Sequence, residues 1–231
     1  MFYWDPTYIL VLIGLAISLA ASGMVNSAMR KYHQVPNTTG ITGAECARRI
    51  LDNEGLYHVQ VEDLGSREGD HFDPSANTVR LSSQNYHGRS VTAMSVAAHE
   101  CGHAIQHAQE YTPIKIRTAL VPVVNIGSHA SMPLILLGVI LSWNHVLIQL
   151  GIIAFSLTVV FQLATLPVEF NASSRALERL ERYGIVTRQE NRGCRKVLSA
   201  AAMTYVAGTL AAVLQLLRLV LLFGGDRRRR D

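Results

Sequence analysis

Two histidines and a glutamate lie close together in the run His99-Glu100-Cys101-Gly102-His103, which has the pattern H-E-x-x-H. Residues four apart on a helix share one face, one turn from each other, so both imidazoles could reach a single Zn²⁺ ion. Glu100, beside the first histidine, is placed to take a proton from a water molecule that the ion activates for attack on a carbonyl. The pattern therefore predicts a zinc hydrolase site with Glu100 as its base. The alternative is a helix with two histidines on its polar face.

The residues around this pattern favour the helix that the spacing requires. Ser90 can cap a helix, and residues 91–109 contain no proline and only one glycine. We therefore predict a zinc helix over residues 91–110.

A catalytic zinc ion usually has three protein ligands, so a third one is expected elsewhere in the chain. His107 lies on the same helix but roughly 12 Å along it from His99, so we expect it on the polar face and not among the ligands. Glu169 is a better candidate, because it is the first charged residue after Arg117 and is followed by Phe-Asn-Ala-Ser. The alternative for Glu169 is an interfacial charge at the end of an apolar helix, with its head in water.

Charged residues make up only 16% of the chain, and they are segregated along it. Three long stretches carry almost none: those between residues 5 and 30, between 117 and 169, and between 196 and 226, where Arg218 is the exception. A helical span needs about 20 apolar residues. The stretches therefore predict a mainly α membrane protein with four spans, at residues 7–27, 119–141, 146–166 and 203–223. The middle two would form a hairpin that turns at Ser142-Trp143-Asn144-His145, because tryptophan favours the membrane interface.

The first span is either a cleaved signal peptide or a permanent anchor. A signal peptide begins with a positively charged segment. The residues before this span, Met1-Phe2-Tyr3-Trp4-Asp5-Pro6, include no basic residue. The apolar part, from Tyr8 to about Val25, is also longer than the core of a signal peptide. We therefore expect an uncleaved anchor.

Residues 30–90 have the pattern of a small α+β unit. Thr42-Gly43-Ala44-Glu45 resembles a capping box that opens a helix over residues 44–53. Strands are expected at His58–Glu62, at His71-Phe72 and at Asn77–Ser82, and together they predict a meander sheet. The last strand could be an edge strand that pairs with an extended substrate backbone.

A further helix is expected over residues 167–183, because Pro167 suits a first helical turn. This helix would carry Glu169, the candidate third ligand. Taken together, the chain is predicted to be a single membrane-embedded domain over residues 1–231.

The cysteines and the basic C-terminal run exclude two other classes of protein. Cys46, Cys101 and Cys194 are odd in number and contain no C-x-x-C pair, so they give no disulfide framework and fit a reducing compartment. Arg227–Arg230 is expected to be a solvated tail that touches anionic lipid, and we predict no nucleic-acid partner.

Several segments are typical of one protein family. The zinc motif lies in residues 97–104, and the acid after the membrane hairpin lies in residues 166–173. The four further segments are residues 42–51, 71–74, 78–82 and 120–128. An H-E-x-x-H helix, a membrane hairpin and then Glu-Phe-x-Ala-Ser resembles the gluzincin architecture of membrane proteases such as HtpX and the prenyl-protein CAAX peptidases. The resemblance is closest to the YugP-like neutral zinc metallopeptidases of bacterial membranes, and it extends over essentially the whole chain.

This resemblance implies a Zn²⁺ cofactor on His99, His103 and Glu169, with Glu100 as the catalytic base. It implies a membrane-bound zinc metalloendopeptidase of the bacterial plasma membrane, with peptide or protein substrates that are membrane-associated or misfolded, and with an accessory partner or an oligomer as further options. Two positions depart from the family pattern. Asn171 stands where such sequences commonly carry Asp, and Ser173 stands where the broader gluzincins place an Asp that supports a ligand histidine.

Two other functions use similar residues. An intramembrane site-2-type protease also has H-E-x-x-H, but it buries the motif in a span, whereas this motif is bracketed by Arg89 and Lys115. A non-catalytic scaffold with structural zinc would need a fourth Cys or His ligand. Cys101 is poorly placed for that role, because it points roughly 200° around the helix from His99.

The distribution of basic residues predicts the orientation in the membrane. Nine Lys and Arg residues lie between the first two spans, and seven lie between the third and fourth. The positive-inside rule therefore places both connections, and the zinc site that they carry, in the cytoplasm. The basic run at the C-terminus opposes this assignment if the fourth segment crosses the membrane completely.

Overall fold

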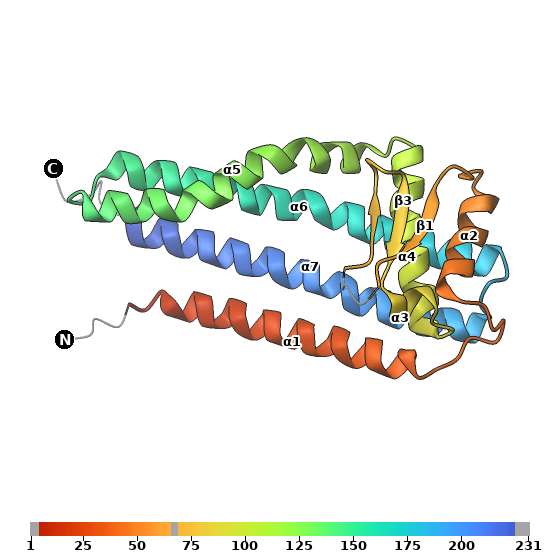
Figure 1. The fold of residues 1–231 in the computed structure, drawn as a ribbon. Helices are drawn as coiled ribbons and strands as arrows, with labels where there is room; N and C mark the ends of the chain where they lie inside the picture. The colour runs from red at the N-terminus through yellow and green to blue at the C-terminus, as the bar shows by residue number, and fades with distance from the viewer. Residues whose placement is uncertain (1–4, 66–68, 225–231) are drawn as a thin grey trace. The chain divides into compact units, whose positions relative to one another are not determined.

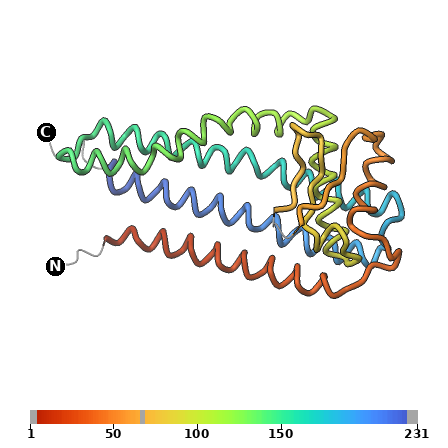
Figure 2. The backbone as a smooth tube through the Cα atoms, in the orientation of Figure 1, coloured from red at the N-terminus to blue at the C-terminus, as the bar shows by residue number. Residues whose placement is uncertain are grey.

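The computed structural model describes residues 5–65 and 69–224, so the basic run Arg227–Arg230 lies outside the described residues. Figures 1 and 2 show a mainly helical chain with one small sheet, which confirms the predicted fold class. In chain order the elements are α1 (Tyr8–His33), α2 (Gly43–Asn53), β1 (Gln60–Asp63), β2 (His71–Asp73), β3 (Thr78–Leu81), α3 (Ser83–Tyr86), α4 (Val91–Ala108), α5 (Thr112–Ile140), α6 (His145–Arg182) and α7 (Arg188–Phe223).

The described residues form two compact units. The first unit contains those of 1–22, 115–166 and 204–231, and the second contains those of 23–114 and 167–203. The four long helices each contribute residues to both units, whereas the sheet and helices α2, α3 and α4 belong to the second unit alone.

Helices α1, α5, α6 and α7 are each long and apolar enough to cross a membrane. Few residues in their most apolar stretches are buried within the protein, from 11% in α1 to 28% in α5. Apolar side chains that the fold leaves uncovered are stable against lipid tails, and the protein is accordingly a membrane protein. The predicted hairpin turn is confirmed, because α5 ends at Ile140, α6 begins at His145, and Ser142 and Trp143 between them have positive φ angles of 56° and 61°.

The one charge inside the last predicted span has partners in the first unit. The Arg218 guanidinium lies 3.7 Å from the Asp5 carboxylate and 4.3 Å from the centre of the Tyr8 ring. An opposite charge and an aromatic face both lower the cost of placing a guanidinium in an apolar helix. Arg218 therefore does not interrupt α7.

The break expected at Pro167 does not occur, because α6 continues through this residue from His145 to Arg182. Proline removes a single N–H from the helical ladder, and long apolar helices tolerate it where neighbouring groups satisfy the freed carbonyl. Glu169 consequently lies in the interior of a long helix and not in the first turn of a new one.

The sheet has the strand order β1-β3-β2, so the meander prediction is wrong. The short turn after Asp73 makes β2 and β3 an antiparallel hairpin, whereas β1 pairs in parallel with the other side of β3. The prediction that residues 77–82 form an edge strand is also wrong, because β3 has a neighbour on each side. Its central position explains why Thr78, Val79 and Leu81 are all buried.

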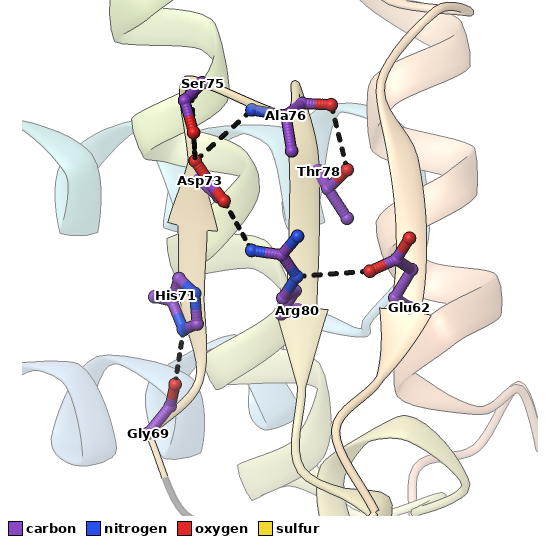
Figure 3. A network of polar contacts seen from close by, with 8 residues as sticks. All are labelled: Glu62, Gly69, His71, Asp73, Ser75, Ala76, Thr78 and Arg80. Atoms are coloured by element: carbon purple, nitrogen blue, oxygen red, sulfur yellow. Dashed lines mark hydrogen bonds and ion pairs between the residues drawn. The ribbon is translucent and has the colours of Figure 1, made fainter.

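On one face of the sheet a single arginine connects all three strands, as Figure 3 shows. Arg80 of β3 donates a hydrogen bond to Glu62 of β1 at 3.1 Å and another to Asp73 of β2. Hydrogen bonds from Ser75 and then from Arg80 hold the pKa of Asp73 well below its usual range. Asp73 is therefore ionised at neutral pH, and β2 is held to the sheet by side chains as well as by its ladder.

Helix α2 begins with the predicted capping box. The Thr42 hydroxyl accepts a hydrogen bond from the Glu45 N–H at 3.2 Å, and the Glu45 carboxylate accepts one from the Thr42 N–H at 2.8 Å. The opposite face of α2 is fully buried and joins the core of the second unit, with Cys46, Ala47, Ile50 and Leu51 at 0% exposure. The cap fixes where this helix starts and so which side chains reach the core.

We expect Thr42→Ala to lower the free energy of unfolding by about 1 kcal/mol, because it removes the side-chain acceptor of the cap. Thermal unfolding of the full chain in detergent, followed by circular dichroism, measures this loss. Thr42→Ser keeps the hydroxyl and is the matched control. A melting temperature that is equal in Thr42→Ala and Thr42→Ser would contradict the role of the cap.

Candidate metal centre

Helix α4 is enclosed by the second unit except along one stripe. Fourteen of its 18 residues are buried, and the stripe that remains consists of His99, His103 and His107 with Ala108 at the helix end. Ser90 caps the helix as predicted, since its hydroxyl accepts a hydrogen bond from the Ala93 N–H at 3.2 Å. The core contacts of the other positions therefore fix the direction in which the histidines point.

Helix α6 approaches the histidine stripe through a glycine of α4. A Cβ atom built on Gly102 would lie 2.6 Å from the carbonyl oxygen of Ala172, so only glycine fits at this crossing. Ala172 lies one helical turn after Glu169. The close approach of the two backbones thus brings the Glu169 carboxylate beside the two imidazoles.

His99, His103 and Glu169 form a compact cluster. One possible ligand atom from each lies within 4.8 Å of the others, and no second group of this kind occurs in the residues that the structure describes. The Nε2 atoms of His99 and His103 lie 3.3 Å and 3.6 Å from Glu169 Oε2. The structure therefore brings together the three residues that were expected to be ligands.

The donor atoms of this cluster fit a zinc ion. Glu169 is 3% exposed, and its Oε2 atom is buried beside the two imidazole Nε2 atoms, without a well-formed hydrogen bond among the described residues. A buried carboxylate oxygen without a partner is costly, whereas two imidazole nitrogens and a carboxylate oxygen are a common donor set for catalytic zinc.

The other ring nitrogen of each histidine contacts a polar side chain. Ser173 Oγ lies 3.2 Å from His99 Nδ1, and Gln106 Oε1 lies 3.1 Å from His103 Nδ1. These contacts leave both Nε2 atoms facing Glu169. Ser173 thus supplies a hydroxyl to His99 at the position where the broader gluzincins place an Asp.

Glu100 lies beside the cluster and is 7% exposed. Burial raises the pKa of its carboxyl above the usual range; the positive charges of His99 and His103 oppose this shift, and the charge of Glu169 adds to it. A carboxyl with a raised pKa is better matched to proton transfer near neutral pH than an exposed one. Glu100 is therefore well suited to accept and return a proton.

The remaining residues that the sequence singled out lie elsewhere. His107 is exposed and contacts the Phe72 ring, with 5.7 Å between ring centres. Cys101 faces the opposite side of α4, where its thiol lies 3.6 Å from the carbonyl oxygen of Ala47. Gln106 was not anticipated from the sequence, since its amide belongs to no metal motif, although its i+3 spacing from His103 places the two side chains on one face.

Comparison with known families agrees with this geometry. The model of a family described as "putative neutral zinc metallopeptidase" matches residues 7–224. The chain belongs to this family. A relative from Bacillus subtilis (strain 168), described as "Putative membrane protease YugP", is 49% identical over 218 residues, which cover 94% of this chain and 96% of the relative. No solved structure matches the chain. The predicted membership of this zinc metallopeptidase family is therefore confirmed.

We expect Gly102→Ala to separate α4 from α6, because the new methyl group would collide with the Ala172 carbonyl. Overpacking of this kind typically costs about 1–3 kcal/mol. The melting temperature and the zinc content of the purified full chain should both fall. Gly23→Ala is the matched control, since Gly23 is also helical but has nothing within 4 Å of an added Cβ. If the two variants retain equal stability and equal zinc, the crossing does not depend on glycine.

Proposed function

We propose that this family member is a membrane-bound zinc metalloendopeptidase that hydrolyses peptide bonds of membrane or misfolded proteins. His99, His103 and Glu169 would hold the zinc ion, and Glu100 would be the catalytic base. The observation that carries the proposal is the three-donor cluster, with its unpartnered Glu169 oxygen, directly beside a buried glutamate of raised pKa.

When bound, a zinc ion polarises a peptide carbonyl and acidifies a water molecule. Glu100 would accept the proton that water loses as its oxygen adds to the carbonyl carbon. The same carboxyl would then donate that proton to the amine that leaves when the C–N bond breaks. Ser173 and Gln106 would hold the two imidazoles in place during this exchange.

The free edge of β2 is the best candidate for binding an extended substrate. Within the described part of the chain β2 pairs only with β3, and Phe72 of β2 touches His107 of the motif helix. An extended peptide could add to this edge through backbone hydrogen bonds. The edge of β2 thus takes the role that the sequence pattern suggested for β3, whose two sides are both occupied.

Two alternatives fit the cluster less well. For an intramembrane site-2-type protease the motif helix should be a span, yet α4 is not among the four candidate spans found in the described residues. For a scaffold with structural zinc a fourth protein ligand would close the site, yet the group found has three members and Cys101 points away from it. Three ligands and one open position favour catalysis.

The family match extends over residues 7–224 and so includes residues of both units, which supports the proposal that they act as one metallopeptidase domain. We further propose that the protein is a multi-pass protein of a bacterial plasma membrane, with its metal centre on the cytoplasmic side. The basic residues that lie between the spans support this orientation.

Removal of a ligand should remove the metal, whereas removal of the base should not. Mutation of a residue that hydrogen-bonds to a metal ligand typically weakens metal binding by roughly 10–100-fold. We expect His103→Ala and Glu169→Gln, which remove a ligand itself, to weaken zinc binding by more than this. Glu100→Gln should retain zinc but lose about 10²–10⁴-fold in kcat/KM on a protein substrate. Metal analysis and a cleavage assay measure the two effects. Wild-type zinc content in Glu169→Gln would dismiss Glu169 as a ligand, and full activity in Glu100→Gln would dismiss the base.

The orientation is tested with single cysteines and a membrane-impermeant thiol reagent. We expect Tyr57→Cys, at a position that is 72% exposed in the second unit, to react only after cells are permeabilised. Ser142→Cys, in the turn between α5 and α6, should react in intact cells. The native cysteines are buried and give a low background. The reverse pattern of labelling would place the metal centre outside the cytoplasm.

A further inference from the structure

Gln106 is a fully buried amide beside the metal centre, with 0% exposure. Its Oε1 atom lies 3.1 Å from His103 Nδ1. Its Nε2 atom donates one hydrogen bond to the carbonyl oxygen of Val168 at 2.8 Å and another to Asn171 Oδ1 at 3.0 Å. A glutamine amide has two N–H donors, so both of them are used, and the oxygen has the imidazole as its partner.

The partners of Gln106 decide which way its amide points. The Val168 carbonyl can only accept a hydrogen bond, and Asn171 Oδ1 already accepts one from Arg175 Nε at 2.6 Å. The amide nitrogen must therefore face these two oxygens, because the reverse orientation would bring oxygen against oxygen. Oε1 is left to face His103, where it can act only as an acceptor.

An acceptor at this place fixes the form of the imidazole. His103 must carry its proton on Nδ1 to donate to Oε1, so in the neutral ring Nε2 keeps its lone pair. That Nε2 atom is the one that lies 3.6 Å from Glu169 Oε2. The amide thus directs the lone pair of His103 toward the centre of the cluster.

The same amide joins the two helices that carry the ligands. Val168 immediately precedes Glu169, and Asn171 follows it by two residues. Both hydrogen bonds from Gln106 therefore hold the part of α6 that presents Glu169 against α4. They lie near the Gly102–Ala172 crossing, where the backbones are too close for a side chain.

We propose that Gln106 is a positioning residue of the metal centre, which sets the Nδ1–H form of His103 and at the same time fixes Glu169 relative to the two histidines. This inference rests on the ligand set of the proposed function. Asn171 contributes through its oxygen alone, as the acceptor that orients the amide of Gln106. Gln106 itself does not touch the metal ion or the substrate.

The test measures the zinc affinity of the full chain in detergent, by competition with a chelator. We expect Gln106→Met to weaken zinc binding about 10–100-fold. Asn171→Leu, which leaves Gln106 in place but removes one of the two acceptors of its amide nitrogen, should also weaken binding. Asn171→Asp keeps an acceptor oxygen and should bind zinc as wild type does. Gln189→Met is the matched control, because Gln189 is an exposed amide in the first turn of α7.

The visible absorption spectrum of the cobalt-substituted protein separates positioning from a loss of general stability. A variant that is merely less stable gives the wild-type spectrum once it is folded and loaded. We expect altered cobalt bands in Gln106→Met and Asn171→Leu, and wild-type bands in Asn171→Asp and Gln189→Met. If Gln106→Met does not fold, Asn171→Leu against Asn171→Asp makes the same comparison.

The outcomes distinguish this inference from the proposed function. Wild-type zinc affinity and wild-type cobalt bands in Gln106→Met or Asn171→Leu would overturn the inference and leave the metallopeptidase proposal intact. Full cleavage activity in Glu100→Gln would overturn the proposed mechanism and leave the role of Gln106 intact, since zinc affinity does not depend on turnover. A wild-type chain that binds no zinc would end both.

Discussion

The metal centre depends on the close contact between two helix backbones at Gly102 and Ala172. Helix α4 carries two of the candidate ligands, and α6 carries the third at Glu169, so the cluster exists only where the two helices meet. A Cβ at residue 102 would lie 2.6 Å from a backbone oxygen of α6. Neither backbone can yield cheaply at such a crossing, because protein interiors are close-packed and helices move as units. The positions of the imidazoles relative to the carboxylate follow from this one contact.

The second constraint is that α4 is enclosed on every side but one. The apolar face of α2 and the central strand β3 belong with α4 to one core, which includes Ile50, Val79, Leu81, Met94 and Ile105. These contacts hold the helix against rotation about its own axis, so the histidine stripe cannot turn away from α6. The small sheet contributes its central strand to this core, and Arg80 ties the two outer strands to that strand through their carboxylates.

The same enclosure explains why the polar groups of the site are so thoroughly connected. Glu100, Gln106 and Glu169 are all buried, and a buried polar or charged group without a partner destabilises the fold. The Gln106 amide has hydrogen-bond partners in His103, Val168 and Asn171. Among the ligand and base residues, Glu169 Oε2 is a buried atom for which the described residues supply no well-formed hydrogen bond. A cation bound there would satisfy it, so binding of the metal and stability of the fold should be coupled.

Local patterns in the amino-acid sequence determined much of the architecture. The spacing of His99 and His103, the caps at Thr42 and Ser90, and the long uncharged stretches all depend on residues within a few turns of one another. For that reason the sequence alone predicted the motif helix, the four apolar helices and the turn before His145. Glu169 stood out because it is the first charge after an apolar helix, a feature that the sequence shows directly.

Tertiary structure decided the features that depend on partners far apart in the chain. Strand pairing placed β3 at the centre of the sheet, because β1 binds the side that the β2–β3 hairpin leaves free. Helix α6 continues through Pro167 because the helix loses only one backbone hydrogen bond there, and the stability of a long apolar helix is greater than that loss. The role of Gln106 was invisible in the sequence, since an amide acquires its orientation only from the acceptors around it, and here they come from α6. Sequence thus named the candidate ligands, and the packing of α6 on α4 decided how they face one another.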